Sequence, residues 1–105
     1  MEFKRLTSTD TETYEKAMKL YAVSFPKHEQ RDAAAQEAIM SNDDYHFDCI
    51  YNGGNWVGLI LYWETEDFIY IDHFCILPEM RNKQLGQKAL EYLASRTDKK
   101  IILEI

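Results

Sequence analysis

The segment from residue 68 to residue 105 constrains the fold most strongly, because a strand pattern is followed at once by a helix pattern and a second strand pattern. Residues 68–76 are apolar at most positions on both faces, so the strand is expected to be central in a sheet and covered on both sides. Residues 83–95 repeat apolar side chains at helical spacing, and residues 101–105 form a short apolar strand. Such a strand–helix–strand unit predicts a crossover with two parallel strands.

The first two thirds of the chain predicts one strand, two helices and a hairpin. A capping box of Thr9 and Glu12 starts the first helix and Pro26 ends it. The turn Asn52-Gly53-Gly54-Asn55 separates two strands. The remaining predicted elements are a strand over residues 2–6, a helix over 32–40, and strands over 47–51 and 56–63. The order is therefore β-α-α-β-β-β-α-β, an α/β domain with a mixed sheet.

Composition limits the class of protein. A chain of 105 residues with 46% hydrophobic residues is expected to form one packed domain rather than a disordered chain. No apolar run approaches the roughly 20 residues that span a bilayer, the start of the chain is no signal peptide, and two cysteines make no disulfide framework. We therefore expect a cytoplasmic protein. The net charge of −6 argues against nucleic acid or an anionic membrane as its partner.

Charge is nevertheless uneven along the chain, since residues 81–100 contain six basic and two acidic residues. Two of the cations, Arg81 and Lys83, lie at the start of the predicted third helix, where cations are unfavourable because the first amides carry partial positive charge. Asn82 is a candidate cap, and Gly86 would allow a ligand or the neighbouring strand to approach closely. This pattern favours a phosphate or pyrophosphate at the junction. The alternative is that both cations turn outward and water satisfies the amides.

Residues 70–86 resemble the GNAT superfamily of acyl-CoA-dependent N-acetyltransferases. They are similar to that family's central strand followed by its pyrophosphate loop, [Q/R]-x-x-G-x-[G/A], in which Arg81 matches the first position and Gly86 the last. The order of elements and the aromatic-proline pair Phe25-Pro26 also agree with the first part of the family's fold. The resemblance implies a GNAT-like mixed sheet that stops before the family's C-terminal helix and last two strands.

The resemblance also implies a function and a set of binding residues. Acetyl-CoA is the expected acyl donor, with no metal, and the acceptor is a primary amine on a small molecule or a peptide, which attacks directly. The family's strand is splayed from its parallel neighbour by a bulge, and the cofactor lies in that opening. The residues implied to bind it are Phe74, Cys75 and Ile76 on the strand, and Arg81, Asn82, Lys83, Gln84, Leu85 and Gly86 in the loop.

Asp72 is the candidate catalytic base, because it interrupts an apolar face of the strand one pleat before Phe74. The alternative is a structural acid paired with an arginine or with backbone. His73 is expected on the opposite face, as a hydrogen-bonded histidine, and Cys75 as a small core residue.

Regular alternation places Tyr70, Phe74 and Ile76 on one face of the strand, opposite Ile69, Ile71 and Cys75. Aromatic residues on neighbouring strands either line an acceptor pocket or pack on one another. The residues to which this applies are Tyr62, Trp63 and Tyr70.

Two departures from the family pattern matter. Gln84 stands where the family usually has glycine, which weakens anion binding if that residue needs positive φ. The strand over residues 101–105 would leave an open apolar edge, which predicts either a homodimer through that edge or a longer natural protein. Besides the acetyltransferase, two readings therefore stay open, a non-catalytic CoA-binding or dimerising module and an interaction domain without a ligand.

Overall fold

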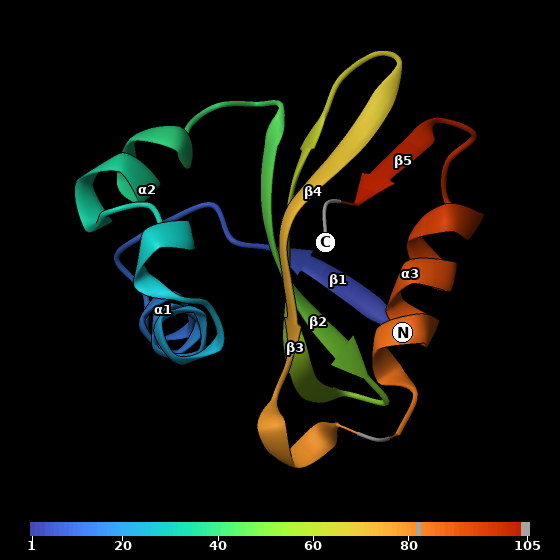
Figure 1. Ribbon diagram of the computed structural model, residues 1–105, viewed down its shortest axis with the longest axis horizontal. Helices are drawn as coiled ribbons and strands as arrows, with labels where there is room; N and C mark the ends of the chain where they lie inside the picture. Colours follow the sequence, from blue (N-terminus) through green and yellow to red (C-terminus); the bar gives the residue numbers. More distant parts are fainter. Residues whose placement is uncertain (82, 104–105) are drawn as a thin grey trace.

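The computed structural model describes residues 1–81 and 83–103, which form a five-stranded sheet between two layers of helix (Figure 1). The order of elements is the predicted one, in an α/β fold with a mixed sheet. The elements are β1 (Glu2–Arg5), α1 (Glu12–Ser24), α2 (Ala33–Ile39), β2 (Tyr45–Asn52), β3 (Asn55–Glu64), β4 (Phe68–Ile76), α3 (Leu85–Ser95) and β5 (Lys100–Leu103). Two short 3₁₀ turns, Lys27–Glu29 and Pro78–Met80, follow α1 and β4.

The strands lie in chain order, β1-β2-β3-β4-β5, within the described residues. Neighbours are antiparallel except β4 and β5, which are parallel as the crossover predicts. In Figure 1, α1 and α2 lie on one side of the sheet and α3 on the other. The strand β4 is therefore covered on both faces, as predicted, but β3 rather than β4 is the middle strand.

Two boundaries differ from the prediction, the start of α1 and the turn between β2 and β3. Thr11, not Thr9, caps α1, because its hydroxyl accepts the amide of Tyr14 at 3.0 Å. The β2–β3 turn has two residues rather than four, since Asn52 pairs with Asn55 and the intervening glycines Gly53 and Gly54 have φ of 61° and 84°. Positive φ at both central residues gives the turn a twist that matches the flanking strands.

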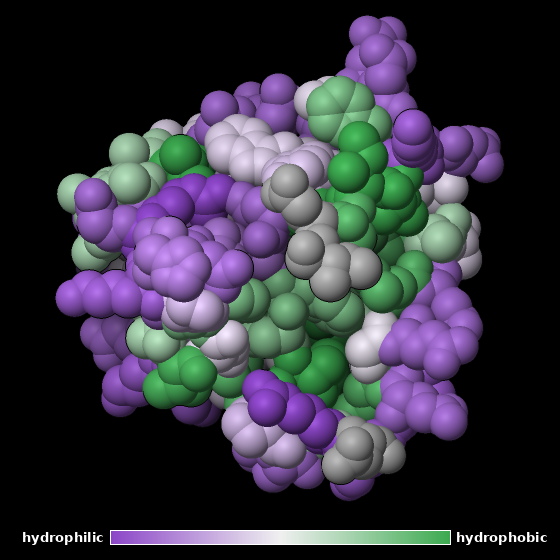
Figure 2. Space-filling model, in the orientation of Figure 1, coloured by the Kyte–Doolittle hydropathy of each residue, from purple (hydrophilic) through white to green (hydrophobic). Residues whose placement is uncertain are grey.

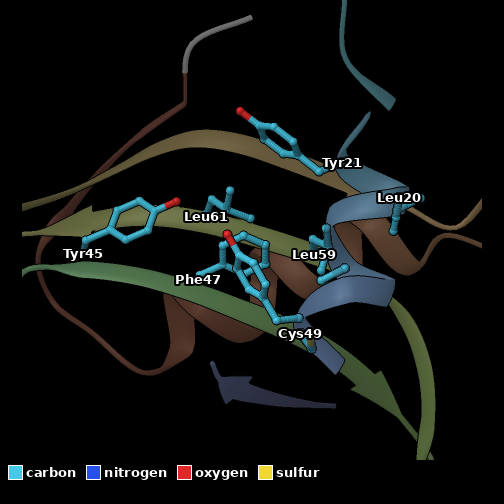
Figure 3. Close-up of a cluster of buried hydrophobic side chains, with 9 residues drawn as sticks. Leu20, Tyr21, Tyr45, Phe47, Cys49, Leu59 and Leu61 are labelled. Atoms are coloured by element: carbon cyan, nitrogen blue, oxygen red, sulfur yellow. The ribbon is translucent and has the colours of Figure 1, made fainter. Parts of the chain in front are cut away.

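Each face of the sheet packs its own hydrophobic core. On the α1 face, side chains from α1, β2 and β3 interdigitate (Figure 3). On the α3 face, β3 and β4 pack against Leu85, Ala89 and Leu93 of α3. Burial on both sides explains why β3 and β4 are apolar along almost their whole length.

A bulge in β4 changes which residues share a face. His73 pairs with Leu61 and Ile71 with Tyr62, so Asp72 is an extra residue with no partner on β3. As a result, Phe74 and Ile76 lie on the α3 face together with Ile69 and Ile71. The predicted alternation was therefore wrong beyond Ile71. The physical reason is that the extra residue reverses the phase of the strand.

Candidate functional site

In the part of the chain that the structure describes, β4 pairs with β5 only before the bulge. The register runs from Phe68 opposite Lys100 to Ile71 opposite Leu103, and no described residue of β5 accompanies β4 further. Figure 1 shows β5 reaching only the middle of β4. Within the described residues, the second half of β4 thus pairs with β3 alone. This half contains the predicted binding residues Phe74, Cys75 and Ile76.

A cavity of about 410 Å³ lies where β4 ends and α3 begins. Arg81 turns back over the end of the strand, because its Nε donates to the carbonyl oxygen of Ile76 at 3.2 Å. The cavity brings together most of the predicted loop residues. Its lining residues are Ile76, Met80, Arg81, Gln84, Leu85 and Gly86. Lys83 is exposed and does not line it, and Asn82 lies outside the described residues.

The amides at the start of α3 have no cap from a side chain of the described residues. The first turn of α3 also contains no acidic residue. The other two α-helices differ, since Thr11 and Asp32 accept amide hydrogens at the starts of α1 and α2. Partial positive charge at the α3 amides therefore faces the cavity beside Arg81, an arrangement suited to an anion.

Gln84 precedes α3 in the left-handed conformation, with φ 59° and ψ 21°. Among the described residues it is the only non-glycine with positive φ. Because Gln84 is not in right-handed helical conformation, α3 begins at Leu85, two residues after the predicted start. The left-handed conformation costs a residue with a side chain about 1–2 kcal/mol. The family's glycine therefore has a conformational reason at this position.

Gly86, in the first turn of α3, faces the end of β4. A β-carbon built there would lie 3.8 Å from Cζ of Phe74 and 3.9 Å from Cγ1 of Ile76, which is ordinary van der Waals contact. Packing of α3 on β4 does not require glycine at residue 86. The space beside it belongs to the cavity.

A larger cleft of about 640 Å³ lies along the bulge, on the side of the α1–α2 connection. Its walls are mainly aromatic and acidic. The lining residues are Phe25, Glu29, Tyr70, Asp72, His73, Phe74 and Leu103. In Figure 2, hydrophobic surface gathers between the two helix layers inside a mainly hydrophilic rim. Because Phe74 lines this cleft and Ile76 the cavity, the two hollows follow each other along β4.

Of the three aromatic candidates, only Tyr70 lines the cleft. Tyr62 stacks on His46 with ring centroids 4.6 Å apart, and Trp63 packs on Tyr45 at 4.9 Å. The packing alternative thus holds for Tyr62 and Trp63.

Asp72 is held by two partners. One carboxylate oxygen accepts from a guanidinium nitrogen of Arg31, and the other lies 3.2 Å from Nδ1 of His73. Burial alone would raise the pKa of Asp72, but the His73 and Arg31 contacts outweigh it and the pKa lies below its usual value. Pairing with an arginine, the structural alternative for this acid, is present; whether Asp72 also acts as base stays a prediction.

His73 and Asp72 lie on the same face of β4, so the prediction of opposite faces was wrong, because the bulge places both side chains toward α1 and the α1–α2 connection. His73 is 8% exposed and hydrogen-bonded, as predicted: its Nε2 lies 2.9 Å from the carbonyl oxygen of Glu29. Cys75 packs against the core of the α1 face, and burial raises the pKa of its thiol.

Three residues of the cleft and its surroundings, Arg31, Phe25 and Glu29, could not be assigned to a site from the sequence. They belong to the connection between α1 and α2, and Arg31 is 41 residues from the acid that it binds. No local pattern identifies such a partner, since only the tertiary fold brings them together. The aromatic-proline pair at Phe25 was noted, but as the end of a helix rather than as a wall of the cleft.

Within residues 1–81 and 83–103, no group of three or more histidine, cysteine or acidic side chains is placed to hold a metal ion. Over the same residues, no helix is long and apolar enough to span a bilayer.

The acetyltransferase (GNAT) family model matches residues 10–104 of this chain. The chain belongs to the GNAT family. No curated protein matches the chain. Among solved structures, a GNAT-family protein from Bacteroides thetaiotaomicron is 28% identical, with a TM-score of 0.91. The alignment covers 100% of this chain and 60% of that chain.

More distant solved structures share the GNAT fold. A ribosomal-protein-alanine N-acetyltransferase from Brucella melitensis biovar Abortus 2308 has a TM-score of 0.72 at 16% identity, covering 99% of this chain and 79% of that one. An aminoglycoside 6′-N-acetyltransferase complexed with coenzyme A has a TM-score of 0.64 at 16% identity, covering 91% of this chain and 54% of that one. At this level of identity the likeness concerns the fold alone.

Proposed function

We propose that this chain takes part in N-acetyl transfer, with acetyl-CoA as donor and a primary amine as acceptor. The observation that carries the proposal is the start of α3, which has no side-chain cap among the described residues and opens on a cavity beside Arg81 at the end of a bulged strand. Membership of the GNAT family and a coenzyme A complex of one structural neighbour support the donor.

The junction residues fit a diphosphate. The amides of Leu85 and Gly86 carry the partial positive charge of the helix start, and Arg81 adds a full charge at the rim of the cavity. Lys83, exposed on the same loop, adds electrostatic attraction. Asn82 is proposed from its place in the loop alone. No carboxylate of the first turn of α3 competes for these donors.

The open half of β4 fits the amide-containing arm of the donor. Phe74, Cys75 and Ile76 have β3 on one side only within the described residues, so their outward backbone groups suit pairing with an extended ligand, although the carbonyl oxygen of Ile76 already accepts from Arg81. The arm would run from the cavity at Ile76 toward the cleft at Phe74.

The cleft beside the bulge suits the acceptor. Glu29 gives it acidic character, whereas the charge of Asp72 is paired with Arg31. Phe25, Tyr70 and Phe74 give it aromatic walls, and none of the described lysines or arginines lines it. These features favour a cationic amine on a small molecule or peptide. Acetyl-CoA, when bound, would supply the thioester carbonyl that the amine attacks, and the C–S bond would break with the CoA thiolate as leaving group. The walls of the cleft orient the amine, and Asp72 is the candidate proton acceptor.

Titration calorimetry with coenzyme A tests the binding half of the proposal. Gly86→Glu places bulk and negative charge at the helix start, so CoA binding should be lost while the fold persists. Gly86→Ala is the matched control, since a β-carbon at this residue meets only ordinary contacts. Equal CoA affinity in both variants would contradict this site.

A second candidate is a module that binds CoA without catalysis. The strained Gln84 in the loop favours it, because the residue that the family uses there is absent. Thioester turnover with a panel of primary amines separates the two candidates. Binding without turnover for any amine would favour the module. A cytoplasmic location also stays a proposal.

A further inference from the structure

The extra residue of β4 is held from outside the sheet. Asp72 has no partner on β3, and its carboxylate instead binds the guanidinium of Arg31. The two side chains are mostly buried, at 12% exposure for Asp72 and 22% for Arg31. A buried ion pair of this kind is strongly coupled, because loss of one partner leaves the other charge unpaired.

Arg31 is itself held by three other elements. Its backbone amide donates to the hydroxyl of Tyr21 at 2.9 Å, and its Nη1 donates to Oε1 of Gln36 at 3.3 Å. Its guanidinium also lies over the ring of Tyr45, 5.3 Å from the centroid. Helices α1 and α2 and strand β2 therefore fix where the guanidinium lies.

The location of the bulge determines which residues of β4 form its open edge, Phe74–Ile76. Within residues 1–81 and 83–103, pairing with β5 extends to Ile71, directly before Asp72, and β4 beyond the bulge pairs with β3 alone. Moving the extra residue along the strand would turn Phe74 or Ile71 to the opposite face. A device that holds the bulge at residue 72 thus keeps both the core and the open edge in register.

We infer that Arg31 is a positioning residue, which anchors the extra residue of β4 and so holds the open edge at Phe74–Ile76 in the geometry that binds the acyl donor. The binding part of this inference rests on the proposed function. It differs from a role of Asp72 as base, because an anchor affects donor affinity whereas a base affects turnover.

Four variants test the anchor. Arg31→Met removes the cation, and Arg31→Met with Asp72→Asn removes both charges, which avoids leaving a buried charge unpaired. Arg31→Lys keeps the charge. Lys99→Met is the matched control. Lys99 also forms an ion pair, with Nζ 2.8 Å from Oε2 of Glu64, but this pair does not involve the bulge. Each variant is measured by amide hydrogen exchange and by titration calorimetry with coenzyme A.

In the double variant we expect exchange over residues 72–76 to be about tenfold faster and the dissociation constant for CoA to rise about tenfold, with α3 and β2 unchanged. Arg31→Lys should restore most of the affinity, and Lys99→Met should match the wild type. Unchanged exchange over residues 72–76, unchanged affinity, or faster exchange over the whole chain would each overturn the inference. If the wild type binds no CoA, the proposed function fails, and the exchange measurement alone decides whether Arg31 anchors the bulge.

Discussion

At the scale of single residues, Gln84 shows how a loop position constrains both stability and binding. Its left-handed backbone is needed to bring the chain from η2 (Pro78–Met80) into α3, yet only glycine adopts it without strain. Gln84→Gly should therefore raise the free energy of unfolding by about 1 kcal/mol, measured by urea denaturation. CoA affinity should rise or stay equal.

Gln87→Gly is the matched control, because Gln87 lies inside α3 in right-handed helical conformation. There the same substitution should lower stability by about 1 kcal/mol. A loss of stability in both variants would contradict the strain assigned to Gln84.

Asp48 is a second residue whose surroundings conflict with its chemistry. It is 4% exposed, Tyr62 donates to its Oδ2 at 3.2 Å, and its Oδ1 has no partner among the described residues. Burial raises the pKa of Asp48 to about 6, although the Tyr62 hydrogen bond and nearby arginines oppose the rise. The carboxyl is therefore protonated in the folded chain at pH values where it ionises in the unfolded chain.

Asp48 should make the chain less stable as pH rises from about 4 to about 6, because the native state binds the extra proton in that window. Asp48→Asn keeps an acceptor for Tyr62 but cannot ionise. At pH 8 this variant should be more stable than the wild type by about 3 kcal/mol, and the difference should vanish near pH 4. Denaturation at both pH values measures it, and a difference independent of pH would count against the buried acid.

At the scale of elements, close contact between β3 and β4 determines where the open edge of β4 lies. A β-carbon at Gly58 would lie 2.3 Å from the carbonyl oxygen of Cys75 and 3.1 Å from Cα of Ile76. Both are backbone atoms, so Gly58→Ala must displace β4.

Gly58→Ala should lower stability by about 1–3 kcal/mol and weaken CoA binding, since the edge at Cys75 and Ile76 moves. Gly86→Ala, whose β-carbon meets only ordinary contacts, should leave stability equal or up to about 1 kcal/mol higher. Urea denaturation and calorimetry measure both effects. Normal CoA affinity in a folded Gly58→Ala variant would show that the edge is elsewhere.

The elements themselves could be predicted from the sequence because their signals are local. Periods of two and of 3.6, together with Pro26 and the paired glycines, predicted in order the strands and α-helices of the described residues, but not the two 3₁₀ turns. The phase of β4 could not be predicted from its residues, because the bulge depends on pairing with β3 and on a partner in a distant loop. The left-handed Gln84 likewise depends on how the chain turns, which composition does not specify.

At the scale of the whole molecule, the candidate site was only partly predictable. The loop before α3 could be proposed because its predicted binding residues are consecutive in the chain. With Ile76 of β4, five of the nine predicted residues line one cavity. The wall of the cleft that the α1–α2 connection forms could not be predicted, because only the tertiary fold brings this connection beside β4. Residues such as Arg31 carry no local mark of their role.

The exposed outer strand β5 leaves the two predicted alternatives open, self-association or a longer natural protein. Ile102 and Leu103 are 36% and 40% exposed, and β5 is the edge of the sheet within the described residues. We propose that two chains pair through this edge. Sedimentation velocity should show a dimer that Ile102→Lys converts to monomer.

Val23→Lys is the control for that prediction, because Val23 is 77% exposed on α1, away from the edge strand. It should leave the dimer intact. A monomer at every concentration of the wild-type chain would contradict pairing through β5.

The bulge in β4 also bears on the cleft that lies along it. Because Asp72 is one residue more than β3 can match, deletion of that residue would bring both halves of the strand into a single alternation. Phe74 and Ile76 would keep the face that they share with Ile69, so the core of the α3 face would persist while the bulge itself is lost. Because Asp72 and its neighbours His73 and Phe74 line the cleft, its shape depends on the length of β4 as well as on the side chains in it.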